Sequence, residues 1–297
     1  MTLPDYSTRE PQNLYAPIAY ALAAGGKRLR PQLAIIAAQV FGADEEAVLP
    51  AAQALEVFHN FTLLHDDVMD HASVRRGRPT VHVKWNENTA ILSGDQMLIE
   101  AYSHLAQLPA DKLPQALVLF NKMATGVCEG QQLDMDFETR NDVTLDDYMR
   151  MIEGKTAILL ATALQLGAYL AGADDAQQQA LFDYGIHLGL AFQIQDDLLD
   201  CFGDPETFGK AIGGDIAENK KTFLWLTARE RKSNWNTIGR ALEDVLADYE
   251  QLGVRAAAEQ AIADHTQQAL ACLDALPHNE YTDQLRQLAQ RLVGRKV

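Results

Sequence analysis

The distribution of prolines restricts the fold of this chain more than any other feature. Ten prolines occur in 297 residues, yet none lies between Gln115 and Asp204. Because proline interrupts helices, a stretch without it can hold long uninterrupted ones. Apolar residues recur mostly at spacings of three and four, Ala, Leu, Gln and Glu dominate, and runs of β-branched residues are scarce. The sequence therefore predicts an all-α fold.

The same spacing predicts where the helices lie. We expect them at about 31–41, 45–69, 88–107, 112–137, 145–172, 176–201, 218–231, 235–251, 254–275 and 279–294, with ends defined to within a few residues. No low-complexity tract or Gly/Ser-rich linker divides the chain. We therefore predict a single domain over residues 1–297, built as a bundle of about ten or more helices.

Charge and composition limit the partners and the compartment. Lys and Arg number 25 against 41 Asp and Glu, which gives a formal charge of −16, so the mean field of the protein repels nucleic acid and we expect no nucleic-acid partner. Three widely spaced cysteines and an N-terminus without a signal pattern favour the cytoplasm. Residues 156–173 carry no charge, but two Thr, a Gln and a Gly dilute them, and we interpret them as a core helix rather than a membrane span.

An aspartate cluster ends the helix expected at 45–69. Asp66 and Asp70 stand four residues apart and so share one helix face, where like charges repel each other. A divalent cation bound by carboxylate oxygens removes that repulsion. A solvated acidic helix end is the structural alternative for a single cluster of this kind.

The pattern recurs at the end of the helix expected at 176–201, where Asp196, Asp197 and Asp200 follow an apolar run. Carboxylates at the C-terminal end of a helix oppose its macrodipole, so both clusters need compensation. If the two helix ends meet, Asp66, Asp70 and Asp196 can hold Mg2+ ions that also bind the oxygens of a diphosphate.

Basic groups accompany both aspartate clusters. They are found in Gly25–Pro31, with Lys27 and Arg30, in Arg75-Arg76-Gly77-Arg78 after the first cluster, and at Lys210, Lys220 and Lys221 after the second. Such groups reverse the negative field locally, as the binding of a diphosphate requires. The alternative is that they serve only solubility.

These residues together resemble the trans-isoprenyl diphosphate synthases, a family that includes farnesyl, geranylgeranyl and longer polyprenyl diphosphate synthases. The resemblance covers nearly the whole chain. It is carried by GGKRLRP (25–31), HDDVMD (65–70), RRGRPTVH (75–82), GDQML (94–98), GQQLDMDF (130–137), EGKTA (153–157), FQIQDDLLD (192–200) and FGKAIGGDIAENKKT (208–222).

The resemblance implies an all-α bundle around a central apolar cavity, a Mg2+-dependent prenyl transfer with three ions per site, and a homodimer. It implies that isopentenyl diphosphate binds at Lys27, Arg30, His59 and Arg76. Allylic diphosphates would bind at Arg75, Lys155, Thr156, Gln193, Lys210 and Lys220. The metal ligands would be Asp66, Asp70 and Asp196, which together with Arg75, Lys155 and Lys210 form the implied catalytic set. Asp67, Asp134, Asp197 and Asp200 would orient these groups, and Arg291, Arg295 and Lys296 resemble the C-terminal cap of the family.

Product length in the family depends on bulky side chains before the first aspartates, here Phe58, Phe61 and Thr62. A helical wheel places Thr62 about 40° and Phe58 about 80° from Asp66, but Phe61 about 140° away. Family experience instead treats an aromatic residue at the Phe61 position as the floor of the cavity. The motif resembles the archaeal geranylgeranyl type, so we expect a twenty-carbon product, with farnesyl diphosphate as the alternative and ordinary core packing as the structural explanation of both rings.

Three other functions compete with this interpretation. A class I terpene cyclase also has a DDxxD helix, but it does not carry a second DDxxD or the GGKRLRP loop. A di-iron bundle needs two Glu-x-x-His units, and only Glu56-Val57-Phe58-His59 occurs. A non-catalytic synthase subunit would be expected to lack some of the aspartates or basic loops, and all are present.

Overall fold

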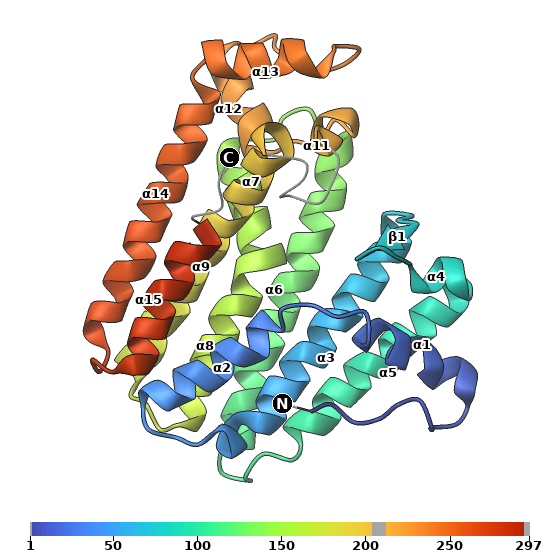
Figure 1. Ribbon diagram of the computed structural model, residues 1–297, viewed down its shortest axis with the longest axis vertical. Helices are drawn as coiled ribbons and strands as arrows, with labels where there is room; N and C mark the ends of the chain where they lie inside the picture. Colours follow the sequence, from blue (N-terminus) through green and yellow to red (C-terminus); the bar gives the residue numbers. More distant parts are fainter. Residues whose placement is uncertain (1, 204–211, 294–297) are drawn as a thin grey trace. The chain divides into compact units, whose positions relative to one another are not determined.

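The structure is a computed structural model that describes residues 2–203 and 212–293, and it is almost entirely helical there (Figure 1). The predicted all-α class is confirmed. The N-terminal elements are α1 (Gln12–Leu22), α2 (Leu29–Val40), α3 (Glu45–Met69), β1 (Val74–Arg75), β2 (Arg78–Pro79), α4 (Val81–Lys84) and α5 (Glu87–Leu105). Next come α6 (Leu113–Thr139), α7 (Leu145–Ile152), the π-helical turn η1 (Glu153–Ala157), α8 (Ile158–Leu170) and α9 (Asp175–Phe202). The C-terminal elements are α11 (Gly214–Ala217), α12 (Phe223–Arg231), α13 (Leu242–Gln251), α14 (Val254–Cys272), η2 (Leu273–Ala275) and α15 (Glu280–Val293).

The chain divides into two compact units. Unit 1 comprises Met1–Leu119 and Leu166–Ala173, and unit 2 comprises Phe120–Gln165 and Asp174–Val297. The divisions fall inside α6 and α8, so each of these helices contributes residues to both units. The organisation of the chain as a single domain stays a prediction.

Unit 1 is built around α3, which packs against α2 and α5. Two glutamates in the first turn of α3 favour its start, since negative charge is stabilising at a helix N-terminus. Leu55, Val57 and Phe58 are buried on α3, as is Met97 on α5. After α3, β1 and β2 form an antiparallel hairpin whose two-residue turn is Arg76-Gly77, both with positive φ.

Unit 2 is built around α9, which packs against α14 and η1. A capping box begins α9, because the Asp174 side chain accepts from the Gln177 N–H while the Gln177 side chain accepts from the Asp174 N–H. The core beside α9 is rich in aromatic residues, among them Tyr148, Phe223 and Trp225. This packing holds the acidic end of α9 against α7 and α12.

Most predicted helices are present, but four predictions need correction. Helices α1, α4 and α11 were not expected, and the helix expected at 145–172 is divided by the π-helical turn η1. The helix expected at 235–251 begins only at Leu242. The helix expected at 218–231 begins at Phe223, since the Thr222 hydroxyl caps it by accepting from the Trp225 N–H at 3.3 Å.

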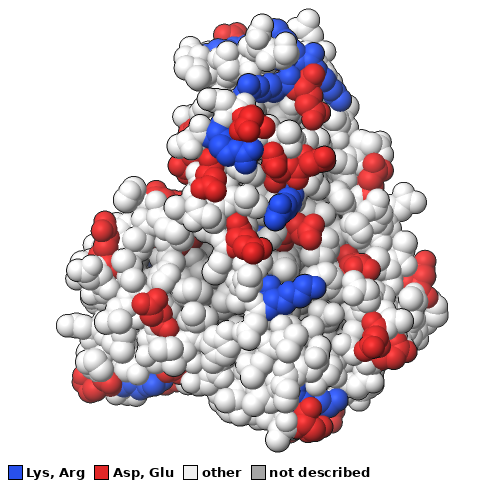
Figure 2. Space-filling view, turned by 180° about the vertical axis from the view of Figure 1, so that it is seen from behind, with Lys and Arg blue, Asp and Glu red and all other residues white. Residues whose placement is uncertain are grey.

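In the part of the chain that the structure describes, no helix has both the length and the apolar character needed to cross a membrane. The predicted cytoplasmic location remains a prediction. On the face shown in Figure 2, Lys and Arg side chains lie among Asp and Glu side chains and do not form one continuous basic area. The expected lack of a nucleic-acid partner also remains a prediction.

Candidate active site

A buried arginine–histidine pair lies in unit 1, between the start of α2 and the middle of α3. The Arg30 Nη1 is 3.1 Å from the His59 Nε2. Burial lowers the pKa of Arg30 to about 10, an effect that the charge of Glu56 partly offsets, so the guanidinium stays protonated at neutral pH. Burial, followed by the charges of Arg30, Arg76 and Arg75, holds the pKa of His59 well below its ordinary value. His59 is therefore neutral.

The contact fixes the tautomer of His59. An arginine only donates, so Nε2 must accept, and the proton of the neutral ring is on Nδ1. The His59 Nδ1 and the Arg30 Nε are both buried and find no hydrogen-bond partner among the described residues. Each of the two side chains thus keeps one buried donor available, which is costly unless an acceptor binds there.

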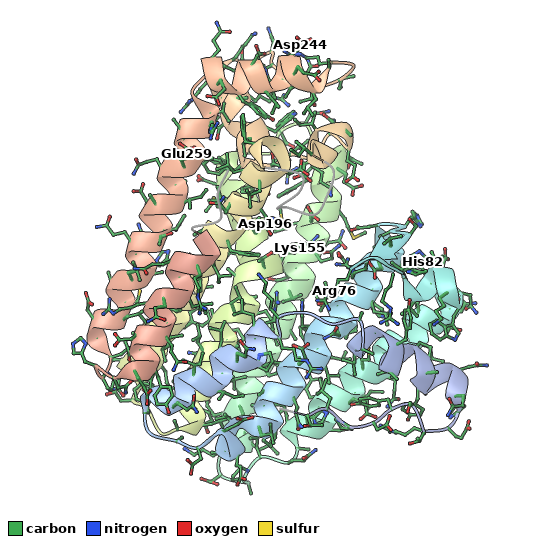
Figure 3. All side chains as sticks on the ribbon, in the orientation of Figure 1. Arg76, His82, Lys155, Asp196, Asp244 and Glu259 are labelled. Atoms are coloured by element: carbon green, nitrogen blue, oxygen red, sulfur yellow. The ribbon has the colours of Figure 1, made fainter. Side chains whose placement is uncertain are left out.

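The glycine loop before α2 is in contact with the tip of the hairpin. The Arg76 Nη1 donates to the Gly25 carbonyl, and a Cβ on Gly26 would lie 2.9 Å from that same nitrogen. Gly26 has φ +138° and Gly25 has φ +78°, conformations that favour glycine. Glycine at positions 25 and 26 therefore permits the close approach of the Arg76 guanidinium. Arg76 is labelled in Figure 3. Lys27 is exposed in this loop.

One guanidinium joins the first two aspartates of the cluster on α3. The Arg75 Nε donates to Asp67 Oδ1 at 2.6 Å, and its Nη2 donates to Asp66 Oδ2 at 3.1 Å. Burial raises the pKa of Asp67, and the charge of Arg75 opposes this rise. Asp70 follows the last residue of α3, one turn after Asp66, and its N–H donates to the Asp66 carbonyl at 2.9 Å. Arg75 thus supplies a positive charge beside the cluster.

The second aspartate cluster, on α9 in unit 2, contains a fully paired member. Asp197 accepts from the Tyr148 hydroxyl at 2.6 Å, from the Phe223 N–H at 3.1 Å and from the Gln193 amide at 3.3 Å. Burial, aided by the charge of Asp215, raises the pKa of Asp197 to about 7, while these hydrogen bonds act in the opposite direction. These hydrogen bonds hold the Asp197 side chain in place near the end of α9. Asp196, the preceding residue of the cluster, is labelled in Figure 3.

The π-helical turn η1 presents the next predicted residues. The Lys155 Nζ pairs with Asp134 Oδ2 of α6 at 2.5 Å, and the Thr156 hydroxyl donates to the Gln193 Oε1 at 3.1 Å. Figure 3 labels Lys155 and Asp196, which come from the neighbouring elements η1 and α9. The turn lies very close to α6, since a Cβ on Gly130 would be only 2.2 Å from the backbone nitrogen of Lys155.

The segment after α9 returns to the acidic end of that helix. The Asp215 N–H donates to Asp200 Oδ2 at 3.0 Å. The Lys220 Nζ lies 2.8 Å from Glu218 Oε2 and 3.8 Å from Asp215 Oδ1. The predicted Lys210, Arg295 and Lys296 lie outside the described residues.

Within each unit the structure brings predicted residues together: Arg30, His59, Arg76 and the Asp66–Arg75 pair in unit 1, and Lys155, Thr156, Gln193, Asp196 and Lys220 in unit 2. Sequence reasoning missed Tyr148 and Gly130, because each acts through contacts with residues distant in the chain. The roles of all these residues stay predictions.

Comparison with known proteins identifies the family. A model of the polyprenyl synthetase family matches residues 11–258. A geranylgeranyl diphosphate synthase of Methanosarcina mazei is 44% identical over 77% of this chain and 72% of its own length. A geranylfarnesyl diphosphate synthase of Natronomonas pharaonis is 38% identical over 97% of this chain and 91% of its own. A crystal structure of a geranylgeranyl pyrophosphate synthase superposes with a TM-score of 0.92, at 47% identity, covering 98% of this chain and 94% of that one.

The chain therefore belongs to the polyprenyl synthetase family. Within that class it is a prenyltransferase, which confirms both the resemblance and the enzyme class predicted from the sequence.

Proposed function

We propose that this enzyme condenses isopentenyl diphosphate with allylic diphosphates in a Mg2+-dependent reaction and that its main product is geranylgeranyl diphosphate. The names of the Methanosarcina mazei relative and of the superposed crystal structure support this product. The observation that carries the proposal is the pair of buried, unpartnered donors on Arg30 and His59. Donors without an acceptor, next to further cationic groups, fit an anionic ligand.

Isopentenyl diphosphate would bind to this donor pair. The Arg30 Nε–H and the His59 Nδ1–H would each offer a hydrogen bond to a diphosphate oxygen. Charge-assisted hydrogen bonds of this kind are roughly twice as strong as neutral ones. Arg76, held by the Gly25 carbonyl, and the exposed Lys27 would add charge at the mouth of the site.

The aspartates fit a magnesium site by their chemistry. Asp66, Asp70 and Asp196 offer hard carboxylate oxygens, which suit Mg2+. Across the described ranges, no group of three His, Cys, Asp or Glu side chains is already assembled to hold a metal. Mg2+ usually keeps several waters and takes part of its ligands from substrate phosphates, so the diphosphate would complete the proposed site. Bound Mg2+, in three ions by family resemblance, would neutralise the diphosphate and favour its departure.

The allylic diphosphate would be bound by the cationic groups that the resemblance implies for it: Arg75, Lys155, Lys220 and Lys210, the last of which lies outside the described residues. Their charges stabilise the diphosphate as the allylic C–O bond ionises, so that no nucleophilic side chain is required. Thr156 and Gln193, joined by a hydrogen bond, would orient the same substrate. The double bond of isopentenyl diphosphate then attacks the allylic cation, and the released proton passes to the departing diphosphate.

The length of the product would be limited by Phe58, Phe61 and Thr62 on α3. Phe58 is buried, Phe61 and Thr62 are partly exposed, and the Thr62 hydroxyl donates to the backbone carbonyl of His59 at 2.8 Å. By family resemblance the growing prenyl chain would meet Phe61, whereas the helical wheel favours Thr62 and Phe58 as the lining.

Product analysis by mass spectrometry tests the function. Purified protein is incubated with isopentenyl diphosphate, Mg2+ and, separately, dimethylallyl, geranyl or farnesyl diphosphate. A twenty-carbon product from each primer is expected. A fifteen-carbon end product would replace the geranylgeranyl assignment by farnesyl, and a failure to elongate any primer would overturn the proposal in favour of a cyclase or a non-catalytic subunit.

We further propose that the enzyme is a homodimer. Large apolar side chains on α5 are exposed at Ile91, Leu92, Ile99 and Tyr102. Apolar groups concentrated on one exposed helix favour burial against a second protein surface. Size-exclusion chromatography with light scattering should give about twice the chain mass of 32.8 kDa. A single species at the mass of one chain would rule out the dimer.

A further inference from the structure

A row of three aromatic rings runs along one face of α3. The Phe58 and Phe61 ring centroids are 5.4 Å apart with the rings inclined at 60°. The Phe61 and His65 centroids are 4.8 Å apart with an inclination of 69°. Both contacts are edge-to-face, the arrangement that aromatic pairs prefer. Phe61 therefore lies between two rings that restrict its side-chain orientation.

The outer ring of this row is fastened to α5. The His65 Nε2 lies 3.0 Å from the Ile91 carbonyl, and since a carbonyl only accepts, Nε2 is the donor. A Cβ on Gly94 would overlap the His65 imidazole. The absence of a side chain at position 94 thus allows the Nε2 edge of the ring to approach α5, where its hydrogen bond holds it.

The three rings differ in their access to solvent. Phe58 is only 1% exposed, whereas Phe61 and His65 are partly exposed. Phe61 is thus the partly exposed phenylalanine of the row, and under the proposed function it is the ring that the growing prenyl chain meets. Its orientation depends on Phe58, which is enclosed by the core, and on His65, which is attached to α5 by one hydrogen bond. Of these two supports, His65 is the one whose removal leaves the core intact.

We propose that His65 is a positioning residue for product length: by holding the Phe61 ring against the row, it limits the number of five-carbon units that the enzyme adds. This inference rests on the proposed function and extends it. The limit on product length would depend on the whole row Phe58–Phe61–His65 and on the hydrogen bond of His65 to α5 beside Gly94, rather than on one phenylalanine.

The test compares His65→Ala with His65→Phe, with His278→Ala as a matched control at an exposed histidine. Farnesyl diphosphate and excess isopentenyl diphosphate are the substrates, and the ratio of twenty-five- to twenty-carbon product is measured by mass spectrometry. Loss of one edge-to-face contact should raise this ratio about two- to tenfold in His65→Ala. His65→Phe keeps a ring against Phe61 and should retain the wild-type ratio, as should the control.

Two additional variants make the result specific. His65→Asn keeps a donor for the Ile91 carbonyl but removes the ring contact, so it should also lengthen the product, and it serves if His65→Ala does not fold. In a Phe61→Ala background, His65→Ala should cause no further lengthening, because His65 acts through Phe61.

The inference is overturned if His65→Ala and His65→Asn give the wild-type product distribution. It is also overturned if both slow every condensation equally, including that of dimethylallyl diphosphate, without lengthening the product, because His65 would then act on the adjacent Asp66. Either result differs from failure of the proposed function, in which the wild-type enzyme itself would elongate no primer.

Discussion

The contact between α6 and the turn η1 yields a quantitative prediction. Gly130 faces this turn so closely that a Cβ there would lie 2.2 Å from the Lys155 backbone nitrogen and 2.6 Å from the Gly154 carbonyl carbon. All the opposing atoms belong to the backbone, so none can rotate away. One turn earlier on the same helix, a Cβ on Gly126 would meet the Ile158 Cδ1 at 2.6 Å, which is the end of a flexible side chain.

The two substitutions Gly130→Ala and Gly126→Ala should therefore differ in their effect on the free energy of unfolding. Each gains about 1 kcal/mol from the better helix propensity of alanine. Overpacking against an immobile backbone costs about 3 kcal/mol or more at Gly130, which gives a net loss of about 2 kcal/mol. A rotamer change of Ile158 costs about 0.5–1.5 kcal/mol, which leaves Gly126→Ala near neutral.

Urea and thermal unfolding of both variants measure the difference. A loss of about 2 kcal/mol should lower the Tm of Gly130→Ala by about 3 °C, whereas that of Gly126→Ala should stay close to wild type. Prenyl transfer should also fall in folded Gly130→Ala, because a shift of Lys155 by about 1 Å can cost roughly a hundredfold in rate. Equal stability and activity of the two alanine variants would refute the reasoning.

Three further outcomes are expected. Asp66→Ala should abolish turnover with an unchanged helical circular dichroism spectrum, and near-normal turnover would contradict its assignment as a metal ligand. Arg30→Gln should raise the KM for isopentenyl diphosphate roughly 10- to 150-fold, from the loss of about 1.5–3 kcal/mol in charged hydrogen bonds, and should leave the KM for the allylic primer nearly unchanged; an equal rise in both would contradict the separate roles. The lowered pKa of His59 means that the unfolded chain binds more protons below about pH 6.5, so stability falls as pH falls. His59→Gln should therefore lose less stability than wild type between pH 7 and pH 5.5 in urea titrations, and an identical pH dependence of the two proteins would argue against a neutral His59.

The sequence predicted the long helices well where local signals are strong. The bounds of α3 were predicted as found, and those of α9 within a residue at each end, because apolar spacing and good capping residues mark them. Helix α1 was missed since Pro11 and Pro17 interrupt its pattern and no side chain caps it. The turn η1 was missed because its residues continue a helical pattern, and the close approach of Gly130 is not visible in the sequence.

The sequence predicted which residues form the candidate site but not how their side chains are arranged in space. Two DDxxD sequences and the basic loops pointed to the aspartates and to Arg30, and the family resemblance added His59. The proton on His59 Nδ1 follows only from burial and from the contact with Arg30. The support of Asp197 by Tyr148 joins residues 49 positions apart and depends on the packing of α7 against α9. Such pairings arise from tertiary contacts, which spacing does not encode.

The π-helical turn between α7 and α8 has a consequence for how such an enzyme can change over evolutionary time. A π-helical turn contains one residue more than the α-helical turn that it replaces, while the flanking helices keep their own hydrogen bonding. A single inserted codon can thus place a lysine such as Lys155 in a new position without rewriting either neighbouring helix. Removal of one residue from Glu153–Ala157 would return this turn to α-helical spacing and displace Lys155, while α7 and α8 keep their own hydrogen bonding.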